Sequence, residues 1–515
     1  MKEKLIQWDL EIRQGRSGQV RKEIEALIRE RRKKPIVRDD LAQVAAIARR
    51  CGAFELSIRL LHPIIRPAAR KMIRATDMER LEYGAALVQI GADREGRELL
   101  SQLDGALVPQ ALLFSAFAHF QRWEYAESLP LLERYIQHPK IQDYTLLIGK
   151  VNYLSALVAV KKYDQAQAMF EDVARRLKEA GNHLLYANLL GIWVQKYIDE
   201  KDWARGEECI DSSIALQNVI GDLPVLYARK WRAVLQLTRN TGSKSALESL
   251  LQVQKEARAL KNWETVRDCD FHRGRLLNDE KLLEFVYFGT PHASFRNRID
   301  QMLGSRFQDQ KTYLWRIQQG ESASRFDLSQ GRWEDSRKKG SLKSGQVSHR
   351  LLQLLGSDFY RSFKLDSMHG EIFPDRFYSP LASPIVMHQS IRRLRVWLQT
   401  NKVPLAIVED AHRYSLQALA PLQLRVHLPS EPETRALQFG LDLRVSKRLG
   451  EYFFRFHGEP KSKGPFTRSD FAQSLGLSER SAGRYLEQAL RAQLIDQVGR
   501  GPMSKYILKK NRPTH

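Results

Sequence analysis

The first half of the chain alternates apolar helical stretches with short polar turns. Five times one apolar helix ends, the chain turns, and another helix opens. In each case a small residue follows a turn residue by three positions, and the small residues recur at steps of 39, 30, 40 and 40 residues. The five stretches are 47–61, 87–100, 118–132, 158–170 and 197–210, with the pairs Phe54/Ser57, Asp93/Gly96, Trp123/Ala126, Tyr163/Ala166 and Trp203/Gly206.

This repeat predicts helix pairs stacked into a solenoid, because the small residue lets the second helix approach the first closely. The pattern, clearest at 125–136 and 163–177, resembles tetratricopeptide repeats with a longer step, over about residues 40–275. The resemblance implies a helical-repeat domain at 1–275 whose concave face binds a peptide, a protein or another copy of the chain. A non-repetitive helical bundle is the alternative.

Beyond residue 276 the pattern changes to short runs rich in aromatic and β-branched residues, broken by Gly and Pro. Such runs predict strands, and an alternating stretch with a central turn predicts a β-hairpin. The predicted strands are at 282–291, 312–320 and 324–335, the predicted helices at 347–361 and 383–399, and the predicted hairpin at 403–419.

The helix at 383–399 is amphipathic and strongly basic. Ile391, Leu394 and Leu398 fall on one stripe, which we expect to be buried. The residues left to face outward are His388, Gln389, Arg392 and Arg393.

The order of strands, helices, basic helix and hairpin resembles the OmpR/PhoB-type winged helix over about residues 325–418. The residues that carry the resemblance are the run 391–395 with Trp397 and Leu398, the run 414–416, and Leu351, Leu352, Leu354 and Leu355. The resemblance implies a winged-helix domain at 285–420, with the basic helix in the DNA major groove and the hairpin along the backbone or minor groove. The implied DNA-binding residues are His388, Gln389, Arg392, Arg393, Arg395 and Arg413. The hairpin turn lacks the family's usual glycines, and a basic helix in a fold that has lost DNA binding is the alternative.

The stretch from Phe466 to Ile495 predicts two helices joined by a tight turn. Thr467 and Asp470 have capping-box spacing, and Gly476 is free to adopt a positive φ in the turn. Ser478 caps the second helix, whose core-facing residues are Ala482, Tyr485, Leu486, Ala489 and Leu490. We expect a preceding helix at 444–458 and, after residue 495, two strands joined by a Gly-Arg-Gly-Pro tip.

This arrangement resembles the winged helix-turn-helix domains of bacterial regulators over about residues 440–510, within a domain at 435–515. The motif S-x-x-S-A-x-R-Y-L-x-x-A-L after L-G-L-S carries the resemblance. It implies that Ser478, Arg480, Ser481 and Arg484 reach base edges or phosphates. It also implies a basic wing with two further DNA-binding residues, Arg500 and Lys505, of which Arg500 contacts the DNA backbone or minor groove. A module for protein interaction is the alternative.

The charge balance strengthens the nucleic-acid interpretation. The chain of 515 residues carries a net charge of +23, and residues 281–515 hold 38 Lys and Arg against 22 Asp and Glu. A polyanion attracts such a surface and gains entropy as counterions are released. Solubility is the simpler alternative explanation for the charge.

The sequence offers little for catalysis or metal binding. Its three cysteines are far apart and lack CxxC spacing, and the four histidines between 349 and 412 lack ligand spacing. We find no phosphate loop, HExxH or GxSxG motif, no apolar leader and no stretch long enough to span a membrane. We therefore expect a cytoplasmic protein that is not an enzyme, without cofactor, metal or membrane contact.

Together these patterns predict a mainly α chain, with a tetratricopeptide-like helical solenoid followed by two α+β winged-helix domains. The expected function is sequence-specific binding of double-stranded DNA in transcriptional regulation, with the solenoid serving dimerisation or partner binding. The alternatives are a non-catalytic protein-interaction scaffold, a replication-initiator-like protein with tandem winged helices, and a nucleic-acid-processing enzyme or its subunit.

Overall fold

The structure is a computed structural model, and it describes most of the chain. The described residues are 1–13, 16–30, 36–67, 74–220, 226–310, 312–317, 324–335, 338–343, 345–373, 376–428, 456, 464–491, 495–499 and 504–508.

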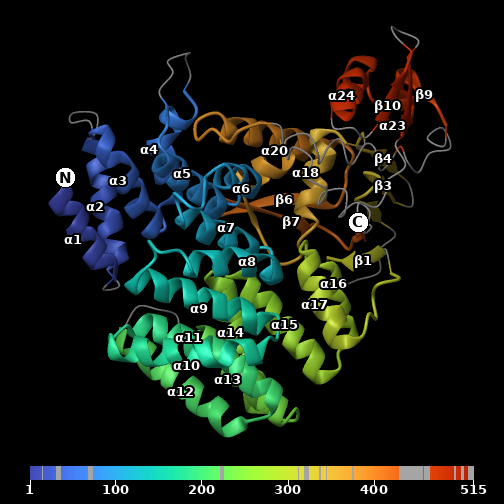
Figure 1. Cartoon of the computed structure of the whole chain (residues 1–515). Helices are drawn as coiled ribbons and strands as arrows, with labels where there is room; N and C mark the ends of the chain where they lie inside the picture. Colours follow the sequence, from blue (N-terminus) through green and yellow to red (C-terminus); the bar gives the residue numbers. More distant parts are fainter. Residues whose placement is uncertain are drawn as a thin grey trace.

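The chain is mainly helical, and its first part consists of helices joined by short turns. Figure 1 shows these helices following an arc that runs from the left of the view through the bottom to the right. They are α1 (Lys2–Arg13), α2 (Ser17–Glu30), α3 (Arg38–Arg50), α4 (Phe54–Ile65), α5 (Asp77–Ile90), α6 (Asp93–Ser101), α7 (Gln110–Phe120), α8 (Tyr125–Ile136), α9 (Asp143–Ala159), α10 (Tyr163–Glu179), α11 (His183–Glu200), α12 (Trp203–Ile220), α13 (Leu226–Arg239), α14 (Lys244–Ala259), α15 (Trp263–Leu277), α16 (Glu280–Phe288) and α17 (Ala293–Leu303). No helix in the described residues is long and apolar enough to cross a membrane.

Four of the five predicted repeat turns join helix pairs as expected. Ser57, Gly96, Ala166 and Gly206 are buried at the fourth position of α4, α6, α10 and α12. The small residue brings the paired helices close: a Cβ on Gly96 would lie 2.8 Å from the carbonyl oxygen of Gly84 in α5. This part of the chain is therefore a tetratricopeptide-like stack of helix pairs.

The fifth predicted pair, Trp123/Ala126, is wrong by two residues. The turn between α7 and α8 is longer than the others, so α8 begins at Tyr125, and Ser128, not Ala126, is the buried small residue. Trp123 instead points away from its own repeat: its Nε1 donates to Glu264 Oε2 at 2.7 Å. The sequence pattern missed this because it assumed a turn of constant length.

The predicted strand at 282–291 is also wrong, because this segment forms most of α16. Its aromatic residues pack on one another and on α15 and α17 in a buried cluster that includes Phe271, Val286 and Phe295. A short apolar run buried on most sides has no periodicity that separates strand from helix. Two helices, α16 and α17, thus follow residue 275 before the first strand.

The second part of the chain alternates strands and helices. Its elements are β1 (Thr312–Arg316), β2 (Arg325–Asp327), β3 (Arg332–Glu334), β4 (Lys339–Ser341), α18 (Val347–Leu355), β5 (Phe363–Lys364), α19 (Leu365–Ile372), α20 (Ser383–Thr400), β6 (Leu405–Asp410), β7 (Arg413–Ala418), β8 (Gln423–His427), β9 (Phe466–Thr467), α23 (Arg468–Leu475), α24 (Glu479–Arg491), β10 (Ile495–Val498) and β11 (Lys505–Leu508). They form sheets of order β1-β8-β2-β3-β4, β5-β7-β6 and β10-β11-β9.

The same topology occurs twice in this part. In β5-α19-α20-β6-β7, the second strand of the hairpin pairs with the strand that precedes the helices, and β9-α23-α24-β10-β11 repeats that order. The register is also repeated, since Phe363 pairs with Tyr414 and Phe466 pairs with Tyr506. We call these two units the middle module (363–418) and the C-terminal module (466–508).

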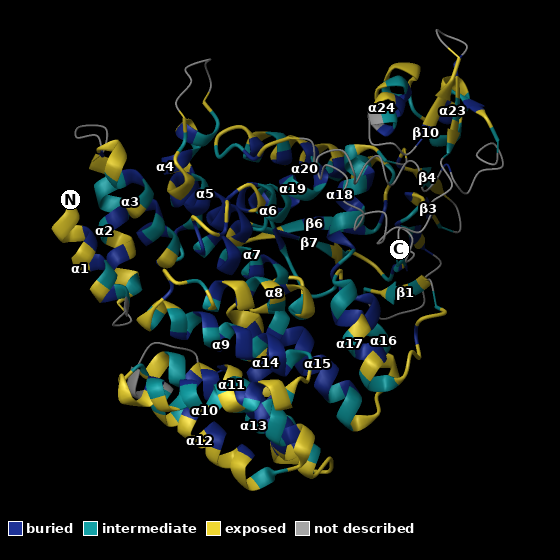
Figure 2. Cartoon of the chain, viewed as in Figure 1, coloured by how far each residue is buried: buried dark blue, intermediate teal, exposed yellow. Residues whose placement is uncertain are grey.

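The middle module shares one core with the five-stranded sheet. Leu351 of α18, Leu394 of α20, Leu405 of β6 and Phe326 of β2 are all buried in it. In Figure 1 this core lies against the inner side of the helical arc, with α20 running across the top. Figure 2 shows exposed residues along the outer side of α20, whereas β6 and β7 beneath it are largely buried or half-buried.

We predict that Gly96→Ala destabilises the helical repeats. The added methyl would lie 2.7 Å from Val88 Cγ2 and 2.8 Å from the Gly84 carbonyl oxygen, so α5 and α6 must move apart. Overpacking of this kind costs about 1–3 kcal/mol. Thermal unfolding followed by circular dichroism should show a lower melting temperature.

Gly18→Ala is the matched control, because no atom lies within 4 Å of the added methyl. Its melting temperature should equal or slightly exceed that of the wild type. Equal melting temperatures for both variants would contradict the close approach of α5 and α6.

Candidate nucleic-acid interface

Helix α20 presents one apolar and one basic face, as its sequence predicts. Met387, Ile391, Leu394 and Leu398 are buried in the core of the middle module. The outward-facing residues His388, Gln389, Arg392 and Arg393 are exposed. The ring of His388 also lies against Tyr414, whose hydroxyl is 3.4 Å from His388 Nδ1. Arg392 and Arg393 are therefore the cations that α20 offers to solvent.

Arg395 and Arg413 have internal roles instead. Arg395 is half-buried and donates from Nε and Nη2 to the carbonyl oxygen of Ile407, at 3.1 and 2.9 Å. Arg413 donates from Nη1 to the carbonyl oxygen of Ser362 at 3.2 Å, and burial together with Arg361 lowers its pKa. These two arginines tie α20 to the hairpin and the hairpin to the start of β5.

The hairpin of the middle module turns without glycine. Ala411 and His412 both have positive φ, 47° and 59°, as a type I′ turn requires. Asp410, at the end of β6, forms an ion pair with Lys261 in the turn between α14 and α15. The tip of the hairpin thus touches the helical repeats, while the side chain of His412 is 98% exposed, and the expected contact of this hairpin with DNA stays a prediction.

The C-terminal module has the predicted local geometry. Thr467 and Asp470 form the capping box in both directions, and Gly476 has a φ of 63°. Ser478 caps α24 by accepting from the backbone N–H of Ser481 at 3.2 Å. These contacts fix the angle between α23 and α24.

Helix α24 is also amphipathic, and the face that carries its arginines is exposed to solvent. Ala482, Leu486 and Ala489 are buried, whereas Arg480 and Arg484 are exposed and Ser481 is half-buried. Lys505 is exposed on β11. Arg500 and the predicted helix at 444–458 lie outside the described residues, except Phe456, which packs on Phe466.

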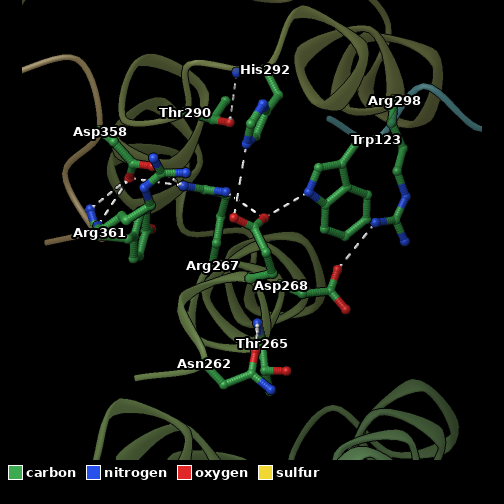
Figure 3. A network of polar contacts seen from close by, with 12 residues as sticks. Trp123, Asn262, Thr265, Arg267, Asp268, Thr290, His292, Arg298, Asp358 and Arg361 are labelled. Carbon is green, nitrogen blue, oxygen red and sulfur yellow. Dashed lines mark hydrogen bonds and ion pairs between the residues drawn. The ribbon is translucent and has the colours of Figure 1, made fainter. Parts of the chain in front are cut away.

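A buried polar network joins the helical repeats to the middle module, and the sequence patterns gave no sign of it. Arg267 of α15 donates from Nη2 to both carboxylate oxygens of Asp358, each at 2.8 Å, and neither side chain is exposed. Arg267 Nη1 also donates to Glu264, whose carboxylate accepts from Trp123 Nε1 and lies 3.9 Å from His292 Nε2. Figure 3 shows Trp123 and His292 beside the pair. The backbone N–H groups of Tyr360 and Arg361 donate to the same carboxylate at 3.0 and 3.1 Å. We call this set of contacts the interlock.

Further contacts hold α19 against the N-terminal helices. Lys364 Nζ lies 3.1 Å from Glu55 Oε1, and the backbone N–H of Tyr378 donates to Glu95 at 2.7 Å. A Cβ on Gly91 would lie 2.7 Å from Ser367 Cβ, so the two segments are in close contact. The helical repeats thus fix the inner side of the middle module and leave the basic face of α20 outward.

Three histidines of this region have lowered pKa values. Burial lowers the pKa of His272, His292 and His369 to about 4, so all three are neutral at pH 7. Within the described residues, no group of three or more His, Cys, Asp or Glu side chains is arranged to hold a metal ion.

Comparison with known proteins gives no family for the chain. No protein-family model matches, and no curated protein matches. Among solved structures, a Rap protein complexed with competence and sporulation factor is 12% identical with a TM-score of 0.42, covering 59% of this chain and 88% of that one. The apo form of RapI is 12% identical with a TM-score of 0.36, covering 56% and 85%. Similarity at this level assigns no function.

We predict that Arg267→Ala strongly destabilises the folded chain. It leaves the Asp358 carboxylate buried without its cation, which costs about 3–5 kcal/mol. Lys261→Ala removes the ion pair with Asp410, which also joins the helical repeats to the middle module. The side chains of Lys261 and Asp410 are 29% and 79% exposed, so the loss costs below about 1 kcal/mol. Thermal unfolding of both variants tests this, and a fall in melting temperature for Lys261→Ala as large as that for Arg267→Ala would contradict it.

The interlock also predicts a pH dependence. Burial alone would raise the pKa of Asp358, but Arg267 and Arg361 outweigh it, so its pKa lies below the ordinary value. Because the unfolded pKa is near 3.9, the pair stabilises the fold above about pH 4 and loses this effect as the pH falls through the lowered pKa. The difference in melting temperature between wild type and Asp358→Asn should therefore be full at pH 7 and should narrow below about pH 4. A difference that is constant with pH would show that the charge of Asp358 does not matter.

Proposed function

We propose that the protein binds double-stranded DNA sequence-specifically and regulates transcription. The observation that carries the proposal is the repeated strand-helix-helix-hairpin topology, with exposed arginines on the second helix of each copy. A winged helix would have this topology, and the sequence resemblance to OmpR/PhoB-type and regulator winged helices supports the same proposal. The net charge of +23 supports a polyanionic partner.

In this proposal α20 and α24 are the reading helices. Each would enter a major groove, where Arg392 and Arg393, or Arg480 and Arg484, contact guanine edges or phosphates. His388, Gln389, Ser478 and Ser481 would supply further polar contacts from the same helices, and Lys505 a backbone contact. Arg395 and Arg413 drop out of the DNA-binding set, since both bond to backbone carbonyls within the middle module.

The helical repeats would bind a protein partner or a second copy of the chain. Because the interlock fixes them to the middle module, a partner that alters α15 would also act on the segment before β5. In this proposal the protein acts in the cytoplasm, without catalysis, cofactor or metal.

A protein-interaction scaffold is the second candidate. It is favoured by the ion pair between Lys261 and Asp410, which places the hairpin tip of the middle module next to the repeats. In this alternative the two modules are assembly units. A replication-initiator-like protein would share the tandem modules and would differ in the sites that it selects.

The test is a selection of genomic DNA fragments by the purified full-length protein, followed by affinity measurements on the selected motif. We expect a shared motif in the wild type. Arg392→Ala/Arg393→Ala and Arg480→Ala/Arg484→Ala should each weaken motif binding by about tenfold or more, since a good base contact is worth about 1–3 kcal/mol.

The matched control is Lys255→Ala/Arg258→Ala, which removes two exposed cations from α14. It should retain the motif and nearly the wild-type affinity. If binding is salt-sensitive, selects no motif and is weakened equally by all three double variants, the DNA-binding regulator is rejected and the protein-interaction scaffold is favoured.

A further inference from the structure

The five-stranded sheet has one buried and one exposed face. Phe326 of β2, Trp333 of β3 and Leu424 of β8 point into the core shared with α18 and α20. Because side chains alternate along a strand, the neighbouring residues point to the opposite face. Along β1, β2, β3, β4 and β8 these neighbours are mostly exposed.

The exposed face is rich in arginine. Cross-strand pairing places its residues in two rows. One row is Arg316, Gln423, Arg325, Glu334 and Lys339, and the other is Leu314, Arg425, Asp327, Arg332 and Ser341. Five of these ten residues are cations, and they come from all five strands. We call them the sheet cations.

The two carboxylates on this face, Asp327 and Glu334, leave it with three more cations than anions. Asp327 accepts from the hydroxyl of Ser329, its Oδ2 lies 3.2 Å from His427 Nε2, and it forms a long ion pair of 3.8 Å with Arg425. Within the described part of the chain, no carboxylate lies within ion-pair distance of Arg316, Arg325, Arg332 or Lys339.

The spacing of the sheet cations suits a charged polymer. Neighbouring strands are about 4.8 Å apart, so Arg316 and Arg325, two strands apart in one row, are separated by about 10 Å at the backbone. The two rows are two residues apart along the strands, which is about 7 Å. Leu314 is the one large apolar residue in the two rows, and both rows lack aromatic rings on which bases could stack.

We infer that the outer face of this sheet binds the phosphate backbone of double-stranded DNA, as a contact separate from those of α20 and α24. Guanidinium groups on an exposed sheet face, in two rows that hold no aromatic ring, suit phosphates rather than base edges. The contact adds affinity and fixes the orientation of the duplex, and it contributes no sequence preference. The inference rests on the proposed function, because it takes DNA to be the partner.

The test compares Arg316→Ala/Arg325→Ala/Arg332→Ala with wild type in DNA affinity over a range of salt concentrations. Each lost phosphate contact lowers the slope of log affinity against log salt by about 0.9, so the slope should become shallower by about 2 to 3. The selected motif should be unchanged. The matched control, Lys244→Ala/Lys255→Ala/Arg258→Ala, removes three exposed cations from α14 and should keep the wild-type slope.

Three results would overturn the inference, and they differ in what they say of the proposed function. A wild-type slope for the sheet variant, together with loss of the motif in the α20 or α24 variants, rejects the sheet contact and keeps the DNA-binding regulator. If the slope of log affinity against log salt becomes equally shallow in the sheet variant and the α14 control, the salt dependence comes from the total charge of the protein and not from the sheet. A wild type that binds no DNA rejects both the sheet contact and the proposed function. If that wild type binds an acidic protein and the sheet variant does not, the acidic protein is the partner of this face. Circular dichroism spectra equal to wild type establish that the variants are folded.

Discussion

The arrangement of the chain depends on the buried ion pair between Arg267 and Asp358. Both side chains are fully removed from water, so each charge is tolerable only in the presence of the other and of the backbone N–H donors around Asp358. A pair of this kind has one satisfied geometry, and that geometry places the segment before β5 against α15. The helical repeats and the middle module are therefore joined as one folded unit.

Contacts around the hairpin decide which cations of the middle module are available to a partner. Arg392 and Arg395 lie on the same helix, three residues apart, yet Arg392 faces solvent and Arg395 bonds to the hairpin carbonyl of Ile407. Arg413 is likewise committed to Ser362. All three side chains carry the same charge, so charge does not predict which of them is exposed. Their exposure depends on which face of α20 packs on the hairpin.

Sequence patterns predicted the elements that depend on local periodicity. The helix pairs, the amphipathic α20, the hairpin at 405–418 and the capping box at Thr467 follow from spacing within a few residues. The patterns failed where contacts between distant segments decide the structure. Trp123 leaves its repeat to bond Glu264, 141 residues later, and Asp358 meets Arg267 across 91 residues. Neither partner carries a local signal, since a tryptophan in a turn or an aspartate in a loop is ordinary in isolation.

The distribution of ion pairs leaves more uncompensated positive charge on the second part of the chain than on the helical repeats. In the repeats, arginines on one helix meet carboxylates on another helix of the stack, as in Arg49 of α3 with Glu82 of α5 at 2.7 Å and Arg229 of α13 with Glu256 of α14 at 2.7 Å. Each of these pairs joins two packed helices and compensates the charge of the arginine locally. The exposed arginines of α20, α24 and the five-stranded sheet include few such pairs among the described residues, so their charges repel one another in the free protein. In the proposed complex, DNA would relieve that repulsion and release its own counterions, so these surfaces, rather than the repeats, would contribute most of the electrostatic binding energy.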